Sequence, residues 1–190
     1  LNITPDTKGL NASPGGACGQ IYFNAKDAEA AAAEGKDVLL VRVETSPEDI
    51  GGMAVSRGIV TCRGGMTSHA AVVARGMGCP CVSGCGEISI NEPKKTLTVN
   101  GKTLQEGDYM AIDGFTGAVY ARKIAVKPSE IMQVLEGTMR ESESMLYQDY
   151  KKFMDYVNEI KTMSVRTNAD TPKDARYAIM LGAEGIGLCR

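Results

Sequence analysis

His69, the single histidine among the 190 residues, is the side chain best suited to covalent chemistry. The apolar residues between positions 70 and 77 recur with the period of a helix, which predicts a helix start near Thr67 or Ser68. The free backbone N–H groups and the positive dipole end of a helix start attract phosphate and disfavour imidazolium. A neutral imidazole nitrogen there can attack phosphorus and carry a phosphoryl group covalently.

Small and polar residues precede this histidine and suit the same chemistry. Gly64 and Gly65 permit a bulky phosphate donor to approach closely. Thr67 and Ser68 can cap the helix and donate hydrogen bonds to a phosphate. Arg75, like Arg63, is either a phosphate contact or a solvated surface charge, and the sequence leaves both interpretations open.

Two other interpretations of the histidine and its surroundings are available. A lone histidine at a helix start is commonly a surface residue without chemistry. Cys79, Cys81 and Cys85 lie nearby and suggest zinc, but the C-x-C-x3-C spacing differs from the C-x2-C of common zinc sites. We therefore expect no metal site and interpret these cysteines as small buried core residues with free thiols.

The elements that must position the histidine follow from local patterns. Residues 1–16, rich in Gly, Pro and Asn, predict an entering linker and turn. Strands are expected at 20–23, 37–43, 58–61 and 81–83, and helices over 27–34 and from Ser46, with Ser46 as N-cap and Pro47 at the first helical position. These elements alternate as in a βαβ fold.

The second half of the chain changes character. Leu97–Val99 followed by Asn100-Gly101 predicts a hairpin, and residues 108–122 predict a second strand–turn–strand unit. Residues 128–161 are charged and helical, interrupted at Gly137. A strand at 163–167, a helix from Thr171 to Leu181 and a strand at 185–188 then predict a minimal βαβ unit, too small to be a domain by itself.

Composition excludes several function classes. With 43% hydrophobic and 23% charged residues and a net charge of −2, the chain has no basic stripe for nucleic acid. No apolar run is long enough for a membrane span. The sequence starts at Leu1 without a secretory signal, so we expect a cytoplasmic protein and leave an organelle such as a chloroplast or glycosome open.

The segment from Arg63 to Gly78 resembles the phosphohistidine motif of the phosphoenolpyruvate-utilising enzymes, and most closely that of the pyruvate, phosphate dikinases among them. The family shares the pattern G-G-x-T-x-H-x-x-x-x-A-R, usually with Arg where this chain has Met66. The segments 9–15, 47–50 and 81–85 are also similar to the dikinases. The resemblance covers essentially the whole chain.

The resemblance implies an α/β fold and a division of the chain into a linker, a domain, a connector and the start of a second domain. Residues 11–123 would form a swivelling β/β/α phosphohistidine domain after an entering linker at 1–10. Residues 124–161 would be a helical connector, and residues 162–190 the first βαβ unit of a truncated (β/α)8 barrel that binds phosphoenolpyruvate and pyruvate.

The resemblance also implies an activity. His69 would take a (pyro)phosphoryl group from ATP at an N-terminal ATP-binding domain and pass it to pyruvate at the barrel. The net reaction of this kinase-type phosphotransferase is ATP + phosphate + pyruvate = AMP + pyrophosphate + phosphoenolpyruvate. Arg166 and Arg190 match two arginines implied to bind the phosphate and carboxylate of phosphoenolpyruvate, with roles dormant in a fragment. The fragment alone is expected to turn over nothing.

Further implications concern cofactors, partners and regulation. Mg²⁺ is expected at the partner domains and not tightly bound here, and the full enzyme is expected to be a homodimer. Thr67 matches a residue phosphorylated by a dedicated regulatory kinase-phosphatase in some members. The alternatives are the same domain of a phosphoenolpyruvate synthase, or a non-catalytic regulatory or metal-binding module.

Overall fold

The run of apolar residues at Val38–Val41 becomes a strand that is buried on both of its faces. The structure is a computed structural model that describes residues 3–189. The chain forms two compact units, residues 1–126 and 127–190, and this strand lies in the first.

The strands all belong to the first unit. They are β1 (Thr7–Lys8), β2 (Leu10–Ser13), β3 (Gly16–Tyr22), β4 (Val38–Arg42), β5 (Gly58–Thr61), β6 (Cys81–Ser83), β7 (Ser89–Asn91), β8 (Thr96–Val99), β9 (Lys102–Gln105), β10 (Tyr109–Asp113) and β11 (Ala118–Tyr120). Its helices are α1 (Ala25–Ala33), α2 (Ile50–Val55), which follows the 3-10 turn η1 (Pro47–Asp49), and α3 (His69–Met77).

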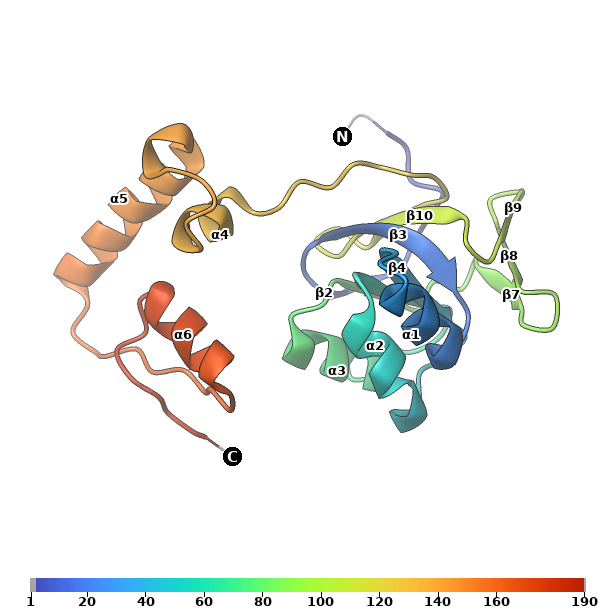
Figure 1. The fold of residues 1–190 in the computed structure, drawn as a ribbon, viewed down its shortest axis with the longest axis horizontal. Helices are drawn as coiled ribbons and strands as arrows, with labels where there is room; N and C mark the ends of the chain where they lie inside the picture. Colours follow the sequence, from blue (N-terminus) through green and yellow to red (C-terminus); the bar gives the residue numbers. More distant parts are fainter. Residues whose placement is uncertain (1–2, 190) are drawn as a thin grey trace. The chain divides into compact units, whose positions relative to one another are not determined.

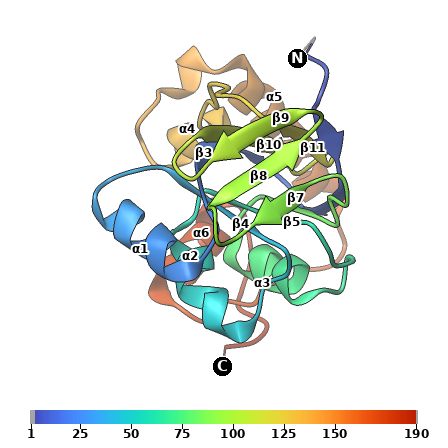
Figure 2. The same cartoon turned by 90° about the vertical axis from the view of Figure 1, so that its right-hand side faces the viewer.

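Two sheets organise these strands (Figures 1 and 2). The larger has the order β1-β11-β10-β3-β4-β5-β6-β2, and its neighbours β3, β4, β5 and β6 run parallel. The strands β10, β11, β1 and β2 are antiparallel additions at either side. The smaller sheet is the antiparallel meander β7-β8-β9. This is the mixed α/β class that the sequence predicts.

The surroundings of strand β4 explain why Val38–Val41 is an unbroken apolar run. Val38 and Leu40 pack with α1, α2 and α3 in one buried cluster, while Leu39 and Val41 pack with β8 and β10 in another. Side chains alternate across a strand, so a sheet covered on both faces requires apolar residues at every position. The helices and the small sheet therefore cover opposite faces of the large sheet.

Local signals fix the ends of several elements as predicted. The expected helix at 27–34 is confirmed as α1, with the side chain of Asn24 accepting the N–H of Asp27, and Gly35 at φ +82° follows its end. The predicted hairpin is confirmed too, because Asn100 (φ +48°) and Gly101 (φ +71°) turn β8 into β9.

The expected linker and turn at residues 1–16 is wrong for residues 7–8 and 10–13, which form strands, whereas Pro14 and Gly15 do form a bend between β2 and β3. Thr7–Lys8 pairs with β11, and Leu10–Ser13 pairs with β6 at the other side of the sheet. Gly9 lies between them, where a Cβ would come 2.5 Å from the carbonyl oxygen of Ser83. Turn-forming residues are common in short edge strands, where only one side of the strand needs a partner, so composition alone misassigned this segment.

The second unit is helical. It contains α4 (Glu130–Leu135), the 3-10 turn η2 (Glu141–Glu143), α5 (Met145–Ile160) and α6 (Pro172–Met180). The interruption expected at Gly137 is confirmed, with φ +77° directly after α4. The helix predicted from Thr171 is confirmed as α6, whose N-cap is Thr171.

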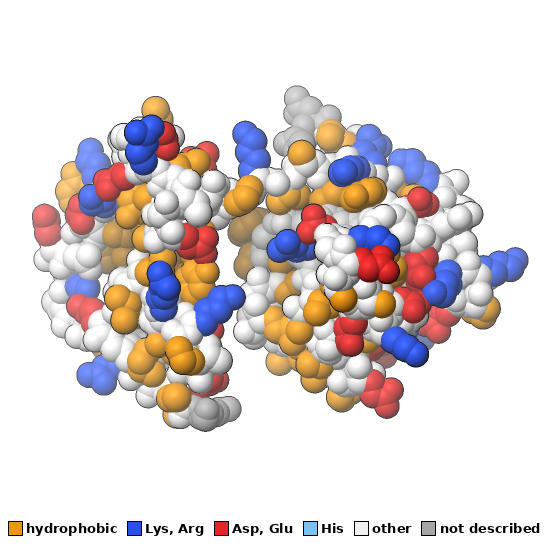
Figure 3. All heavy atoms as spheres, in the orientation of Figure 1, with side chains coloured by type: hydrophobic (Ala, Val, Ile, Leu, Met, Phe, Trp, Pro, Cys, Tyr) orange, Lys and Arg blue, Asp and Glu red, His pale blue; other side chains and the backbone are white. Residues whose placement is uncertain are grey.

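The two strands predicted around α6 are not formed as strands. The segments 163–167 and 185–188 meet in one parallel bridge, Thr167 with Ile186. Two parallel segments without a third neighbour leave most of their backbone and apolar side chains in solvent, and Met163 is 79% exposed. The unit shows many hydrophobic side chains on its surface (Figure 3). The identification of residues 162–190 as the start of a barrel, and the division at residues 10, 123 and 161, stay predictions.

Within residues 3–189, no helix is both long enough and apolar enough to cross a membrane.

Candidate functional site

His69 is the first residue of α3, close to the start predicted for this helix. Ser68 is the N-cap in extended backbone conformation, and its Oγ accepts the N–H of Ala71 at 3.4 Å. The helix ends at Gly78, whose left-handed conformation (φ +65°) suits glycine. The imidazole therefore lies where the free N–H groups of a nine-residue helix meet the surface.

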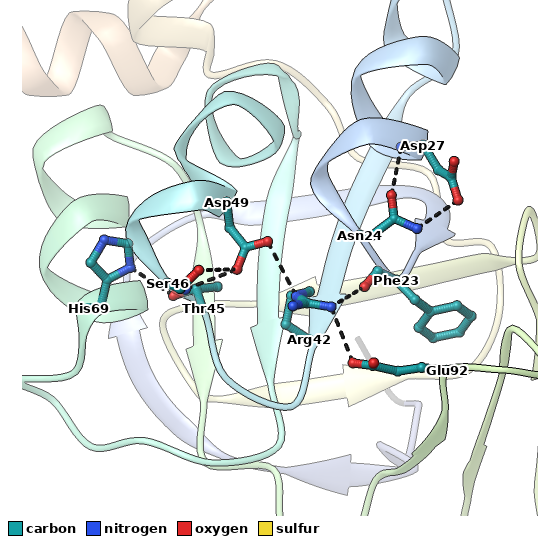
Figure 4. Close-up of polar contacts among 9 residues, drawn as sticks. All are labelled: Phe23, Asn24, Asp27, Arg42, Thr45, Ser46, Asp49, His69 and Glu92. Carbon is teal, nitrogen blue, oxygen red and sulfur yellow. Dashed lines mark hydrogen bonds and ion pairs between the residues drawn. The ribbon is translucent and has the colours of Figure 1, made fainter.

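The ring of His69 is held by a threonine that the sequence did not indicate. Thr45 Oγ1 lies 3.0 Å from Nδ1 of His69 (Figure 4). Thr45 follows β4, and the loop before His69 follows the parallel neighbour β5. Carboxyl ends of adjacent parallel strands meet at one edge of a sheet, so the strand order was the signal that could have brought Thr45 to the site.

The contact with Thr45 bears on which ring nitrogen carries the proton and which carries the lone pair. When Nδ1 carries the proton and donates it to Thr45 Oγ1, the lone pair of the neutral ring is on Nε2. Among residues 3–189, no hydrogen-bond partner of Nε2 is present, and His69 is half-buried. In this tautomer Nε2 has the lone pair that nucleophilic attack on phosphorus requires, so its role as a nucleophile stays a prediction.

The two glycines before the helix differ in role. Gly64 has φ +107°, and a Cβ on it would lie 2.9 Å from Cβ of Ser68. Its carbonyl oxygen would also lie 2.9 Å from a Cβ on Gly84. Nothing lies within 4 Å of a Cβ built on Gly65. Gly64 is therefore needed by the loop itself, while Gly65 lies beside open space.

The two arginines near the loop make contacts within the protein. Arg75 donates from Nη2 to the carbonyl oxygen of Met66 at 2.6 Å, so it braces the loop against the last turn of α3. Arg63 is exposed, with Nη1 4.0 Å from Oε1 of Glu44. Thr67 is exposed on the loop. A phosphate contact by Arg75 stays a prediction.

The cysteines behave as core residues. Cys62, Cys79, Cys81 and Cys85 are buried free thiols. Burial raises the pKa of the Cys79 and Cys85 thiols to about 12, so both are protonated at neutral pH, as expected for thiols packed in a core. The described part of the chain contains no group of three His, Cys, Asp or Glu side chains that could hold a metal ion. The metal-binding interpretation therefore gains no support.

The two arginines expected to bind phosphoenolpyruvate belong to the second unit. Arg166 is exposed and lies near Gly185, where a Cβ would be 3.6 Å from its Cγ. Arg190 lies outside the described residues. Their role stays a prediction.

Comparisons with known proteins bear on the family. Residues 34–117 match the family model described as PEP-utilising enzyme, mobile domain. Pyruvate, phosphate dikinase of Clostridium symbiosum is 52% identical over 95% of this chain, and the enzyme of Rhizobium meliloti is 50% identical over 96%. Pyruvate, phosphate dikinase 1, chloroplastic, of Oryza sativa subsp. japonica is 51% identical over 96%. The expected resemblance is thus confirmed.

Nearly all of this chain is matched, but only a small part of each relative is. The chain spans only 18–19% of their length. Among solved structures, an Enzyme I (nEIt) protein studied by NMR matches 56% of this chain and 37% of its own at 27% identity. Its TM-score of 0.31 is too low to bear on the fold.

Proposed function

We propose that the chain, whose residues 34–117 match the family model described as PEP-utilising enzyme, mobile domain, is the phosphoryl-carrier segment of a pyruvate, phosphate dikinase, with His69 as the carrier. One observation carries the proposal. His69 opens α3 with Nδ1 against Thr45 and Nε2 free, in a chain half identical to such dikinases over 95% of its length.

The residues around His69 supply what a phosphoryl carrier requires. The Nε2 lone pair forms the bond to phosphorus, while the bond from phosphorus to the leaving oxygen breaks and its electrons stay on that oxygen. The N–H groups at the start of α3 face the developing charge, and Ser68 can turn its hydroxyl to the phosphate. Open space beside Gly65 admits the donor. In transfer to pyruvate the bond from phosphorus to Nε2 would break with its electrons staying on Nε2, and phosphorus would bond to the enolate oxygen that pyruvate presents after a base of the partner domain has taken a methyl proton.

The proposal assigns the remaining parts to other segments of a longer chain. An ATP-binding domain would charge His69, and a barrel beginning at residue 162 would receive the phosphoryl group with help from Arg166 and Arg190. Residues 11–123 would swivel between them on the segments 1–10 and 124–161. The dimeric state of the full enzyme and its place in the cytoplasm or an organelle belong to the same proposal.

The net reaction would be ATP + phosphate + pyruvate = AMP + pyrophosphate + phosphoenolpyruvate. Magnesium would neutralise phosphate charge in such a reaction. Because the described residues form no cluster that could hold a metal ion, we assign magnesium to the partner domains.

A chimera tests the proposal. The matched segment of the Clostridium symbiosum dikinase is replaced by this chain, and the product is incubated with labelled phosphoenolpyruvate. We expect acid-labile, base-stable label on His69 and none in the His69→Asn chimera, with the parent enzyme as positive control. A folded chimera without label, or a labelled His69→Asn chimera, would contradict the proposal. Turnover that requires phosphate and releases pyrophosphate separates a dikinase from a phosphoenolpyruvate synthase.

Regulation at Thr67 is a separate part of the proposal. Thr67 is exposed and lies two residues before His69, so a phosphate on its hydroxyl would repel a second phosphate at Nε2. In the chimera, we expect Thr67→Val to keep the basal activity and to lose inhibition by a regulatory kinase. Undiminished inhibition of the Thr67→Val chimera would exclude this site.

A further inference from the structure

A line of polar contacts connects His69 to the end of strand β4 (Figure 4). Thr45 contacts Nδ1 of His69, and the next residue, Ser46, donates its backbone N–H to Oδ2 of Asp49 at 2.9 Å. The hydroxyl of Ser46 lies 3.4 Å from the same oxygen. The other oxygen, Oδ1 of Asp49, lies 3.4 Å from Nε of Arg42. Both carboxylate oxygens are thus engaged along one line that leads to the histidine.

Arg42 is itself anchored to other elements. It is the last residue of β4, and its Nη1 donates to the carbonyl oxygen of Phe23 at 2.7 Å and to Oε1 of Glu92 at 3.2 Å. Phe23 follows β3 and Glu92 follows β7. The guanidinium therefore connects Asp49 to the ends of one strand from each sheet.

The burial of Asp49 is more than a helix cap requires. Ser46 and Asp49 form a capping box at η1, and a capping box needs only the contact between these two residues. Yet the Asp49 side chain is 6% exposed, where an ionised carboxylate is costly unless it is paired. Nε of Arg42 has no hydrogen bond of good geometry, so its contact with Oδ1 is held by charge. Charge on both residues keeps Asp49 turned toward Ser46.

We propose that Asp49, held by Arg42, is a positioning residue for His69, an inference that rests on His69 being the phosphoryl carrier. The N–H of Ser46 belongs to the planar peptide unit that also contains Cα of Thr45. By holding this N–H, Asp49 fixes the place of the Thr45 hydroxyl. The hydroxyl oxygen then accepts Nδ1–H, which selects the tautomer with its lone pair on Nε2.

The consequence for the reaction is specific. In the selected tautomer the Nε2 lone pair forms the bond to phosphorus and the leaving group departs with its bonding electrons. The proton on Nδ1 stays on the ring against Thr45, so no proton must move before attack. In the other tautomer Nε2 carries the proton and cannot attack. Loss of Asp49 or Arg42 should therefore lower reactivity by changing the tautomer.

The tautomer can be measured directly, because His69 is the only histidine of the chain. We expect the ¹⁵N spectrum of histidine-labelled protein, recorded where the ring is neutral, to show mainly Nδ1–H. Asp49→Asn and Arg42→Gln should each shift it toward Nε2–H, and Arg42→Lys should restore part of the wild-type spectrum. Asp27→Asn is the matched control. Asp27 also stands at a helix start and pairs with Lys95 at 2.6 Å, but has no contact with the line to His69.

The rate of phosphorylation supplies the second readout. Phosphoramidate is used as donor, so that its phosphorus–nitrogen bond breaks, ammonia leaves with the electron pair, and no partner domain is needed. Loss of one hydrogen bond to the ring is expected to slow phosphorylation of Nε2 roughly tenfold in Asp49→Asn and in Thr45→Val. Because Asp49 acts through Thr45, the double variant should also be slowed roughly tenfold and not roughly a hundredfold.

The outcomes separate this inference from the proposed function. An unchanged tautomer in folded Asp49→Asn and Arg42→Gln, or additive losses in the double variant, would overturn the positioning role. If Asp49→Asn does not fold, Arg42→Gln and Arg42→Lys carry the same test. A tautomer that depends on Asp49, together with a chimera that takes no label from phosphoenolpyruvate, would refute the proposed function and leave the positioning role intact.

Discussion

Gly64 and Gly65 are neighbours in the sequence, but only one of them is required by the backbone. At φ +107° an L side chain on Gly64 is strained, and its Cβ would press on Ser68. We expect Gly64→Ala to lower the free energy of unfolding by about 2 kcal/mol and to slow phosphorylation of His69 by displacing the N-cap. Gly65→Ala, which meets nothing within 4 Å, should leave unfolding unchanged. Urea unfolding followed by circular dichroism measures both.

The same two variants also separate a role in the conformation of the loop from a role in admitting the phosphate donor. If Gly65 serves the close approach of a phosphate donor, Gly65→Ala should slow phosphorylation by phosphoramidate without loss of stability. Equal stability of Gly64→Ala and Gly65→Ala would contradict the conformation described for this loop.

His69 could be predicted from the sequence because its signals are local. A glycine-containing loop, N-cap candidates and helical periodicity all lie within a few residues of it. Thr45 and Asp49 could not be assigned in this way. They precede His69 by 24 and 20 residues, and only the parallel pairing of β4 with β5 brings their loop to the start of α3. The motif thus indicated the proposed nucleophile but not the residues that contact it.

At the scale of elements, strands with two buried faces were predicted, but β1 and β2, the edge strands of the large sheet, were not. Val38–Val41 is apolar throughout because it faces two cores, which makes its assignment secure. Thr7–Lys8 has no such pattern, since it is a two-residue strand at the end of the sheet. Its place depends on contacts with residues more than a hundred positions away, such as the pairing of Thr7 with Val119. No local pattern reports such a contact.

Asp6 ties this edge strand to two other elements. Its side chain is 3% exposed, receives Lys102 Nζ at 2.7 Å and accepts the N–H of Ala121 at 2.8 Å. Burial alone would raise the pKa of Asp6, but the hydrogen bonds from Lys102, Ala121 and Asn100 together lower it below its ordinary value. The charged form is therefore the one that stabilises the fold.

We expect Asp6→Asn to lose about 2 kcal/mol of unfolding free energy at pH 7. The pKa of Asp6 is lower in the folded protein than in the unfolded chain. Ionised Asp6 therefore contributes fully to the free energy of unfolding above the unfolded-state pKa of about 3.9, and this contribution is lost as pH falls through the folded-state pKa. The gap between wild type and Asp6→Asn should therefore close in acid below about pH 4. Asp37→Asn, which removes an exposed ion pair with Arg57, is the control and should change little. A gap that persists unchanged into acid would contradict the role of the Asp6 charge.

At the scale of the whole molecule, the two units differ in how much they bury. All three hydrophobic clusters lie within the first unit. Among residues 127–189 only Ser144, Ala169 and Ala178 are buried, and none of them is large. The second unit instead exposes large apolar side chains, including Met145, Phe153, Ile160, Met163 and Ile179. A segment of this size with so small a core is expected to be marginal by itself.

Shortening the chain after Val126 tests this difference. We expect residues 1–126 to keep the ¹⁵N signals of His69 and the main unfolding transition of the full chain, because every cluster that stabilises the site is retained. The full chain should show an additional transition at lower temperature in calorimetry, absent from residues 1–126, and should bind a hydrophobic dye that the shortened chain does not bind. One cooperative transition for the full chain, or loss of the His69 signals on shortening, would contradict the independence of the two units. Independent folding of the first unit is also what a carrier requires, since a domain that moves between two active sites must keep Thr45, Asp49 and His69 in register without help from either.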